Sequence, residues 1–383
     1  MSEYQYYEFQ AMDRPLGSKQ MGELRRISSR AEITPHSFVN VYNYGDFHGD
    51  PAKLVARYFD AFLYLANWGT HWLMLRVPSK LLAPEVAAAY DAGHCLSSRE
   101  QRGNHILSFR SEDEEDYEWA EGDGWLASIV PLRAELMRGD LRALYLGWLL
   151  AAQMEEVDED TVEPPVPPGL GDLDVPLVRL AEFLRIDTDL VAAAAECSIA
   201  RQNVSLSKRE LERWITKLPA KERNTLLAEL LTSDDPHLVS EIRQRAIGEV
   251  RGAPPQPTAS RRTAAELLDR ARELGEARRK KEAAQRAREK ARQERRAAAK
   301  RKKHLESLVG QEVRLWAEVH ELIGTRLPKS YDKAVSLLRD LHDLARMQDG
   351  DPEVFAERMT ALQAEHRRKK TLLERFEKAK LID

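Results

Sequence analysis

The segment from Arg261 to Lys303 constrains this chain most, because it combines a strong positive charge with an almost complete lack of apolar side chains. It holds 18 Lys and Arg against 7 Asp and Glu, a net charge of +11. Between Leu274 and Leu305 no Leu, Ile, Val, Met or aromatic residue occurs. Such a segment has no apolar stripe to bury in a core or a coiled coil, so we expect it to be solvated.

The rest of the chain has the opposite charge. The 383 residues carry a formal net charge of −4, so the 340 residues outside the basic segment carry −4 − 11 = −15. Two runs, 112–123 and 155–174, contain eight Asp or Glu each and no Lys or Arg. Segregated charge of this kind is typical of an interaction arm or tail, because like charges held together repel unless a partner or ions neutralise them.

We expect the basic segment to form a long solvated helix. Ala, Arg, Lys, Glu and Gln dominate it, and all of them are strong helix formers. Ser260 or Thr263 can supply the N-cap, and several Glu residues precede a cation by four positions, which supports a helix. Fully helical, the 43 residues would span roughly 65 Å.

The charge of this helix predicts contact with nucleic-acid phosphates. Duplex DNA presents one negative charge per roughly 1.7 Å of axis, and RNA would satisfy the same electrostatics. Without aromatic or apolar side chains, the helix would contact the backbone and would not distinguish sequences. The predicted contacts are Arg278, Arg279, Lys280, Lys281, Arg286, Arg288, Lys290, Arg292, Arg295, Arg296, Lys300, Arg301, Lys302 and Lys303.

Three alternatives to nucleic-acid contact exist for the basic segment. It can bind an acidic protein partner, which would make the chain a scaffold or regulator. It can dock on the chain's own acidic runs, or it can be a solvated spacer between two folded regions.

The remaining pattern predicts an α+β N-terminal domain followed by mainly α-helical regions. Strand-like patterns occupy 4–12, 38–44, 72–77 and 105–110, and a helix is expected over 18–28. Asp50 and Pro51 form an N-cap and first-turn pair, which predicts a helix over 51–67. The predicted organisation is an α+β domain with a helical end (1–154), an acidic and Pro-rich linker (155–175), a helical domain (176–252), a Pro-rich linker (253–260), the basic helix (261–303) and a helical bundle (304–383).

The C-terminal 80 residues return to amphipathic helices joined by short connections, which favours an antiparallel bundle. The leucine-rich stretches from Trp316 to Leu344 and from Leu372 to Leu381 resemble the C-terminal helical part of bacterial SWIM-type zinc-finger proteins of unassigned function. That finger needs Cys-x-Cys and Cys-x-His, whereas this chain has only Cys95 and Cys197, so no zinc ligand is carried over. The resemblance implies a bacterial cytoplasmic protein from a group linked to nucleic-acid or protein binding.

Other candidate sites receive no assignment. Two groups contain metal-ligating residue types. The first suits a turn followed by a capped helix, and the spacing of the second matches no standard zinc site, so we predict no metal and no cofactor. The two groups are His36, Asp46, His48 and Asp50, and Asp91, His94, Cys95 and His105. The aromatic residues of the first 47 positions resemble sheet packing more than a base-stacking platform.

The sequence contains no motif of a known enzyme class. The GxxxxGK[ST], GxSxG and HExxH patterns are absent, and the two cysteines exclude a disulfide framework. No secretory signal pattern begins the chain, and no apolar run reaches membrane-spanning length.

We therefore expect a non-enzymatic cytoplasmic adaptor that binds DNA or RNA and other proteins of a bacterial complex, with no membrane partner. An enzyme with an unrecognised site in the N-terminal domain is the alternative.

Overall fold

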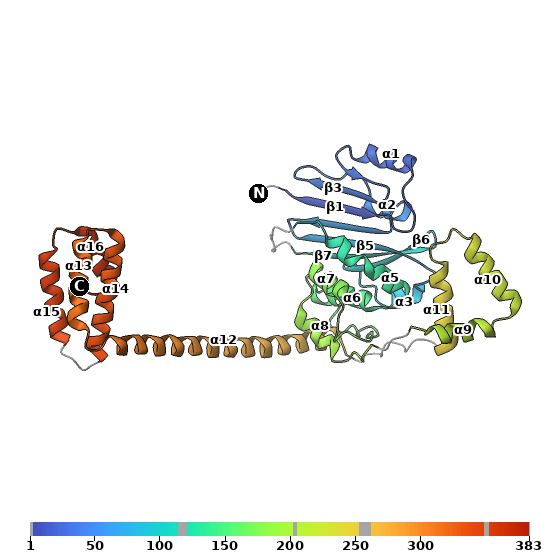
Figure 1. Ribbon diagram of the computed structural model, residues 1–383. Helices are drawn as coiled ribbons and strands as arrows, with labels where there is room; N and C mark the ends of the chain where they lie inside the picture. Colours follow the sequence, from blue (N-terminus) through green and yellow to red (C-terminus); the bar gives the residue numbers. More distant parts are fainter. Residues whose placement is uncertain (1–2, 114–120, 202–204, 253–261, 348–351, 383) are drawn as a thin grey trace. The chain divides into compact units, whose positions relative to one another are not determined.

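The computed structural model shows an N-terminal antiparallel sheet followed by many helices, which confirms the predicted fold class (Figure 1). The chain divides into two compact units, Met1–Arg278 and Arg279–Asp383. The structure describes residues 3–113, 121–201, 205–252, 262–347 and 352–382.

A seven-stranded antiparallel sheet forms the centre of the first unit, with strand order β2-β3-β1-β4-β5-β7-β6. All four predicted strands are present, as β1, β3, β5 and β7, whereas the other three were not predicted. The strands are β1 (Gln5–Gln10), β2 (Glu32–Ile33), β3 (Ser37–Tyr42), β4 (Ala61–Ala66), β5 (Thr70–Pro78), β6 (Leu96–Gln101) and β7 (Asn104–Glu112).

The predicted helix over 51–67 is correct only in its first half. Helix α2 (Pro51–Arg57) begins after the Asp50 cap as expected, but residues 61–66 form β4. This strand lies in the middle of the sheet, with Phe62 packed on one face and Leu63 on the other. A strand buried on both faces is apolar throughout, and over six residues that pattern does not differ from a buried helix.

Both faces of the sheet are covered. Helices α1 (Ser18–Ile27) and α2 lie on one face, where Phe9 and Phe38 form an aromatic core (Figure 1). The other face packs against α6, whose residues 142–152 are all buried, together with neighbouring helices. The helices on this face of the sheet are α3 (Pro84–Ala88), α4 (Trp125–Ile129), α5 (Pro131–Met137), α6 (Arg142–Gln153), α7 (Val175–Phe183) and α8 (Thr188–Ala195).

Residues 155–175, expected to be a linker, pack onto the sheet domain. Val166 and Leu170 belong to its main core, and the Glu163 side chain is completely buried. Val162 forms an isolated antiparallel bridge with Thr263, close to the start of the basic helix. The acidic residues of this segment therefore include one that is built into the core.

A smaller helical group follows within the first unit. It consists of α9 (Lys208–Lys217), α10 (Ala220–Thr232) and α11 (Leu238–Arg251), with Trp214 and Ala246 buried between them. His237 lies 2.8 Å from the Asp13 carboxylate, which also receives two hydrogen bonds from the buried Arg133. The contact between His237 and Asp13 connects the helical group to the sheet domain.

Helix α12 (Ala264–Leu308) is the predicted basic helix, and it extends a few residues beyond Lys303. Among the described residues of the second unit, α12 is followed by α13 (Glu312–Gly324), α14 (Pro328–Met347), α15 (Pro352–Glu365) and α16 (Lys370–Lys378). They share a core that includes Val319, Leu338 and Phe376.

Two hairpin glycines give a matched test of this fold. Gly69, between β4 and β5, has φ of +94°, and a Cβ there would lie 1.7 Å from the Asp113 carbonyl oxygen. Gly103, between β6 and β7, has φ of +74°, but no described atom lies within 4 Å of its Cβ position. We expect Gly103→Ala to cost about 1–2 kcal/mol from the left-handed backbone alone. Gly69→Ala should cost about 1–3 kcal/mol more, because the hairpin must also move.

Urea unfolding of both variants and of the unchanged protein measures these costs. Equal destabilisation by the two substitutions would contradict the close approach of the Gly69 backbone to Asp113.

Candidate nucleic-acid interface

The basic helix α12 begins with a capping box. The Thr263 hydroxyl accepts a hydrogen bond from the Glu266 amide at 3.3 Å, and the Glu266 carboxylate accepts one from the Thr263 amide at 2.9 Å. Thr263 is thus the N-cap, and it is one of the two residues predicted for this role. The other, Ser260, lies outside the described residues. The first turns bury Ala264 and Leu267 in the core of the sheet domain.

A buried ion pair attaches this end of α12 to the sheet domain. Arg262 donates to the two carboxylate oxygens of Glu163 at 3.0 and 2.8 Å, and the Tyr145 hydroxyl donates to the same carboxylate. Burial opposes the charge on Arg262, but the hydrogen bonds to Glu163 and the negative charge of Glu163 together raise the pKa of the guanidinium. Burial and the Glu163 charge raise the pKa of Tyr145, so its phenol stays protonated and remains a donor.

Two more ion pairs follow along the first turns of the helix. Arg270 binds Glu196 at 2.9 and 2.7 Å, and Arg278 binds Asp189 with two contacts of 2.9 Å. Arg278 is a predicted nucleic-acid contact, and its guanidinium is held by a carboxylate of the same chain. Docking on the chain's own acidic runs, an alternative left open above, is seen at Arg262, which binds Glu163 of the run 155–174. Asp189 and Glu196 lie outside both runs.

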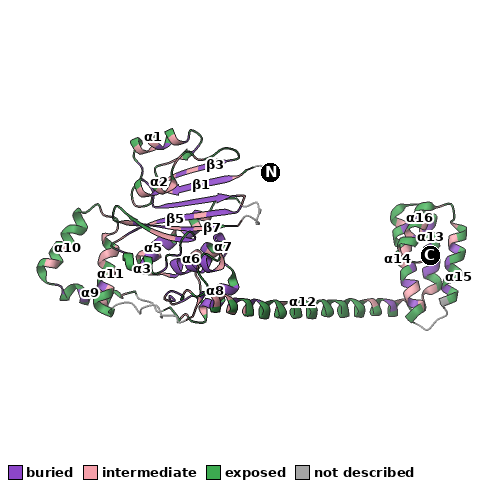
Figure 2. Ribbon diagram, turned by 180° about the vertical axis from the view of Figure 1, so that it is seen from behind, coloured by how far each residue is buried: buried purple, intermediate pink, exposed green. Residues whose placement is uncertain are grey.

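Between Arg279 and Lys300, α12 is exposed on all sides (Figure 2). Every residue in this stretch is exposed except Glu282, which is half-buried. It contains ten Lys and Arg against three Glu, a net charge of +7 over roughly 33 Å. Several of these cations have no carboxylate oxygen of any described residue within 4.0 Å: Arg288, Lys290, Arg292, Arg295, Arg296 and Lys300.

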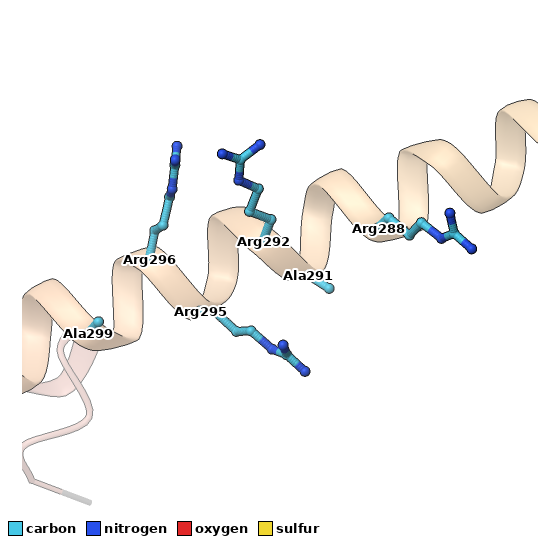
Figure 3. Close-up of a pocket in the computed structure, with 6 residues that line it drawn as sticks. All are labelled: Arg288, Ala291, Arg292, Arg295, Arg296 and Ala299. Carbon is cyan, nitrogen blue, oxygen red and sulfur yellow. The ribbon is translucent and has the colours of Figure 1, made fainter.

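One side of this stretch forms a surface that we call the arginine face. Its members recur at spacings of three and four residues, which places them on the same side of a helix. In Figure 3, Arg292 and Arg296 project along one edge of this face, and Arg288 and Arg295 project along its opposite edge. The short alanine side chains leave the space between the guanidinium groups open. The arginine face consists of Arg288, Ala291, Arg292, Arg295, Arg296 and Ala299.

The C-terminal end of α12 is held by carboxylates of α14. Arg301 donates to Asp340 and, at 2.6 Å, to Asp343, and His304 lies 2.9 Å from Asp340. Burial opposes the charge on Arg301, but the two carboxylates outweigh burial and raise the pKa of its guanidinium. Arg301 is the second predicted contact that is engaged by the chain's own acids.

All fourteen predicted contact residues lie on α12. Thirteen are exposed, and Arg301 is half-buried. The acids that bind Arg278 and Arg301 lie 89 and 39–42 residues away along the chain and were not predicted from the sequence. No local spacing indicates pairs that are so distant in sequence.

The structure does not assemble either predicted group of metal-ligating residue types. In the described part of the chain, neither group places three ligand atoms within 4.8 Å of one another. Asp50 caps α2 by accepting a hydrogen bond from the Lys53 amide at 3.1 Å, and Cys95 is buried in the main core. Most aromatic residues of the first 47 positions, such as Tyr7 and Phe9, are buried in the sheet core, whereas Tyr44 is exposed.

No family model, curated protein or solved structure matches this chain. The resemblance of the C-terminal helices to SWIM-type zinc-finger proteins therefore stays a prediction. Within the described ranges, no helix combines the length and apolar character needed to cross a bilayer.

The buried Arg262–Glu163 pair allows a test of how α12 is attached. Arg262→Leu leaves a buried carboxylate without its cation, so we expect it to lower the free energy of unfolding by about 3–5 kcal/mol. The double variant Arg262→Leu/Glu163→Gln should recover most of this loss, because no buried charge remains and Tyr145 keeps an acceptor. Urea unfolding followed by tryptophan fluorescence measures both values.

The control is Arg270→Leu, which removes a partly exposed pair with Glu196. Exposed pairs contribute little, so this change should cost less than about 1 kcal/mol. Equal losses for Arg262→Leu and Arg270→Leu would show that the buried pair has no special role.

Proposed function

We propose that this protein binds the phosphate backbone of nucleic acid through residues 279–300 of α12, without sequence specificity and without catalysis. The observation that carries the proposal is the exposed net charge of +7 on this stretch, where Arg288, Arg292 and Arg295 lack a carboxylate partner among the described residues. A polyanion supplies the negative charge that the chain itself does not place there.

The spacing of these cations supports the proposal. Four pairs of basic residues stand four positions apart, where like charges destabilise a helix by about 0.2–0.5 kcal/mol each. Phosphates would remove this repulsion and release the counterions condensed on the nucleic acid. The four pairs are Arg286–Lys290, Arg288–Arg292, Arg292–Arg296 and Arg296–Lys300.

The shape of the exposed stretch also suits a nucleic acid. A single α-helix with its side chains is about 10–12 Å wide, close to the roughly 12 Å width of the DNA major groove. A length of roughly 33 Å corresponds to about one turn of duplex DNA. Because the stretch has no aromatic ring to stack on bases and no large apolar side chain to wedge between them, we take phosphates as its main targets in both DNA and RNA.

Neutralising three residues of the arginine face tests the proposal. We expect Arg288→Gln/Arg292→Gln/Arg295→Gln to weaken binding to duplex DNA and to single-stranded RNA alike, because each change removes one phosphate contact. The slope of log K against log salt concentration should become shallower by about three. Glutamine is also a strong helix former, so circular dichroism should show unchanged helicity.

A matched control removes three exposed arginines elsewhere, as Arg209→Gln/Arg213→Gln/Arg223→Gln in α9 and α10. It changes the net charge equally and should leave affinity and salt slope nearly unchanged. If both triple variants lose affinity equally, the site is not on α12. If the intact protein binds neither DNA nor RNA but retains an acidic protein through α12, the scaffold alternative replaces this proposal.

A further inference from the structure

The second unit brings together three residues that can bind a metal ion. They are His320 on α13, Glu365 at the end of α15, and His366, the residue that follows it. One ligand atom from each lies within 4.8 Å of the other two, and no other such group of three occurs among the described residues. The two histidines are 46 positions apart, so the packing of α13 against α15 is what joins them.

The distances within this group do not describe a hydrogen-bonded network. His320 Nδ1 lies 3.9 Å from Glu365 Oε2, and His366 Nε2 lies 3.7 Å from Glu365 Oε1. Both separations exceed the length of a hydrogen bond. They are close to the separation of two ligands on one zinc ion, which is roughly 3.3–3.4 Å for tetrahedral bonds of about 2.0–2.1 Å.

An independent observation concerns His366 alone. Its Nε2 is buried and has no hydrogen-bond partner in the described structure, although it faces the Glu365 carboxylate. Buried polar atoms are nearly always satisfied, so an orphaned imidazole nitrogen requires an explanation.

We propose that His320, Glu365 and His366 form a site for a divalent transition-metal ion, with zinc as the preferred ion. Two imidazoles and one carboxylate are a known zinc ligand set that leaves a fourth position for water or another ligand. An ion bound there links α13 to the end of α15 and gives His366 Nε2 its missing partner. The site lies outside residues 279–300 and does not depend on the proposed nucleic-acid function.

Zinc titration of the full chain, without a histidine tag and after treatment with a chelator, tests the site. Calorimetry should show one tightly bound Zn²⁺ per chain, and zinc should raise the melting temperature of the protein. The variants His320→Gln, Glu365→Gln and His366→Gln should each weaken zinc binding by more than about tenfold to hundredfold. A loss of that size is typical when a residue that only hydrogen-bonds to a metal ligand is removed. Mg²⁺ should not compete, because it prefers oxygen ligands.

The matched control is His48→Gln, which removes an exposed histidine of the sheet domain and should leave zinc affinity unchanged. Circular dichroism without metal checks that each variant folds. If His366→Gln does not fold, Glu365→Gln and His320→Gln still test the site, because they change exposed side chains. The site is disproved if the intact chain binds no stoichiometric zinc, or if folded ligand variants bind zinc as the intact chain does. Nucleic-acid affinity of these variants should stay unchanged, so the two proposals fail separately.

Discussion

The buried contact between Arg262 and Glu163 determines how the basic helix starts. Either charge alone would be costly in the core, so each requires the other, and the Tyr145 hydroxyl completes the set. The contact joins three parts of the chain: helix α6, the packed segment 155–175 and the residue before the Thr263 cap. With this end held, α12 continues as a helix into a stretch that has no apolar packing of its own.

The carboxylates that contact α12 from other elements are found towards its ends. Asp189 binds Arg278 near one end, and Asp340 and Asp343 bind Arg301 near the other. The cations between them keep a net charge of +7, while the rest of the chain outside Arg261–Lys303 carries −15. A polyanion is therefore attracted to the middle of α12 and repelled by most of the remaining chain. This contrast favours external phosphates over the chain's own acids as partners of the arginine face.

Local patterns predicted the elements whose signal lies within a few residues. The Thr263 cap, the amphipathic helices of the bundle and the alternating strands β1 and β3 all follow from spacing along the chain. Prediction failed at β4, because burial on both faces removes the alternation that marks a strand. It also missed the group of His320, Glu365 and His366, because that group depends on which helices pack together and not on any ligand spacing in the sequence.

The sequence alone determined that the basic segment forms a helix that is largely exposed over residues 279–300. Strong helix formers without large apolar side chains favour helical backbone and have nothing to bury. Only the tertiary structure decided which cations of that helix are already bound by the protein. An ion pair depends on the distance between two charged atoms, and for Arg278 and Arg301 that distance is set by the packing of segments far apart along the chain.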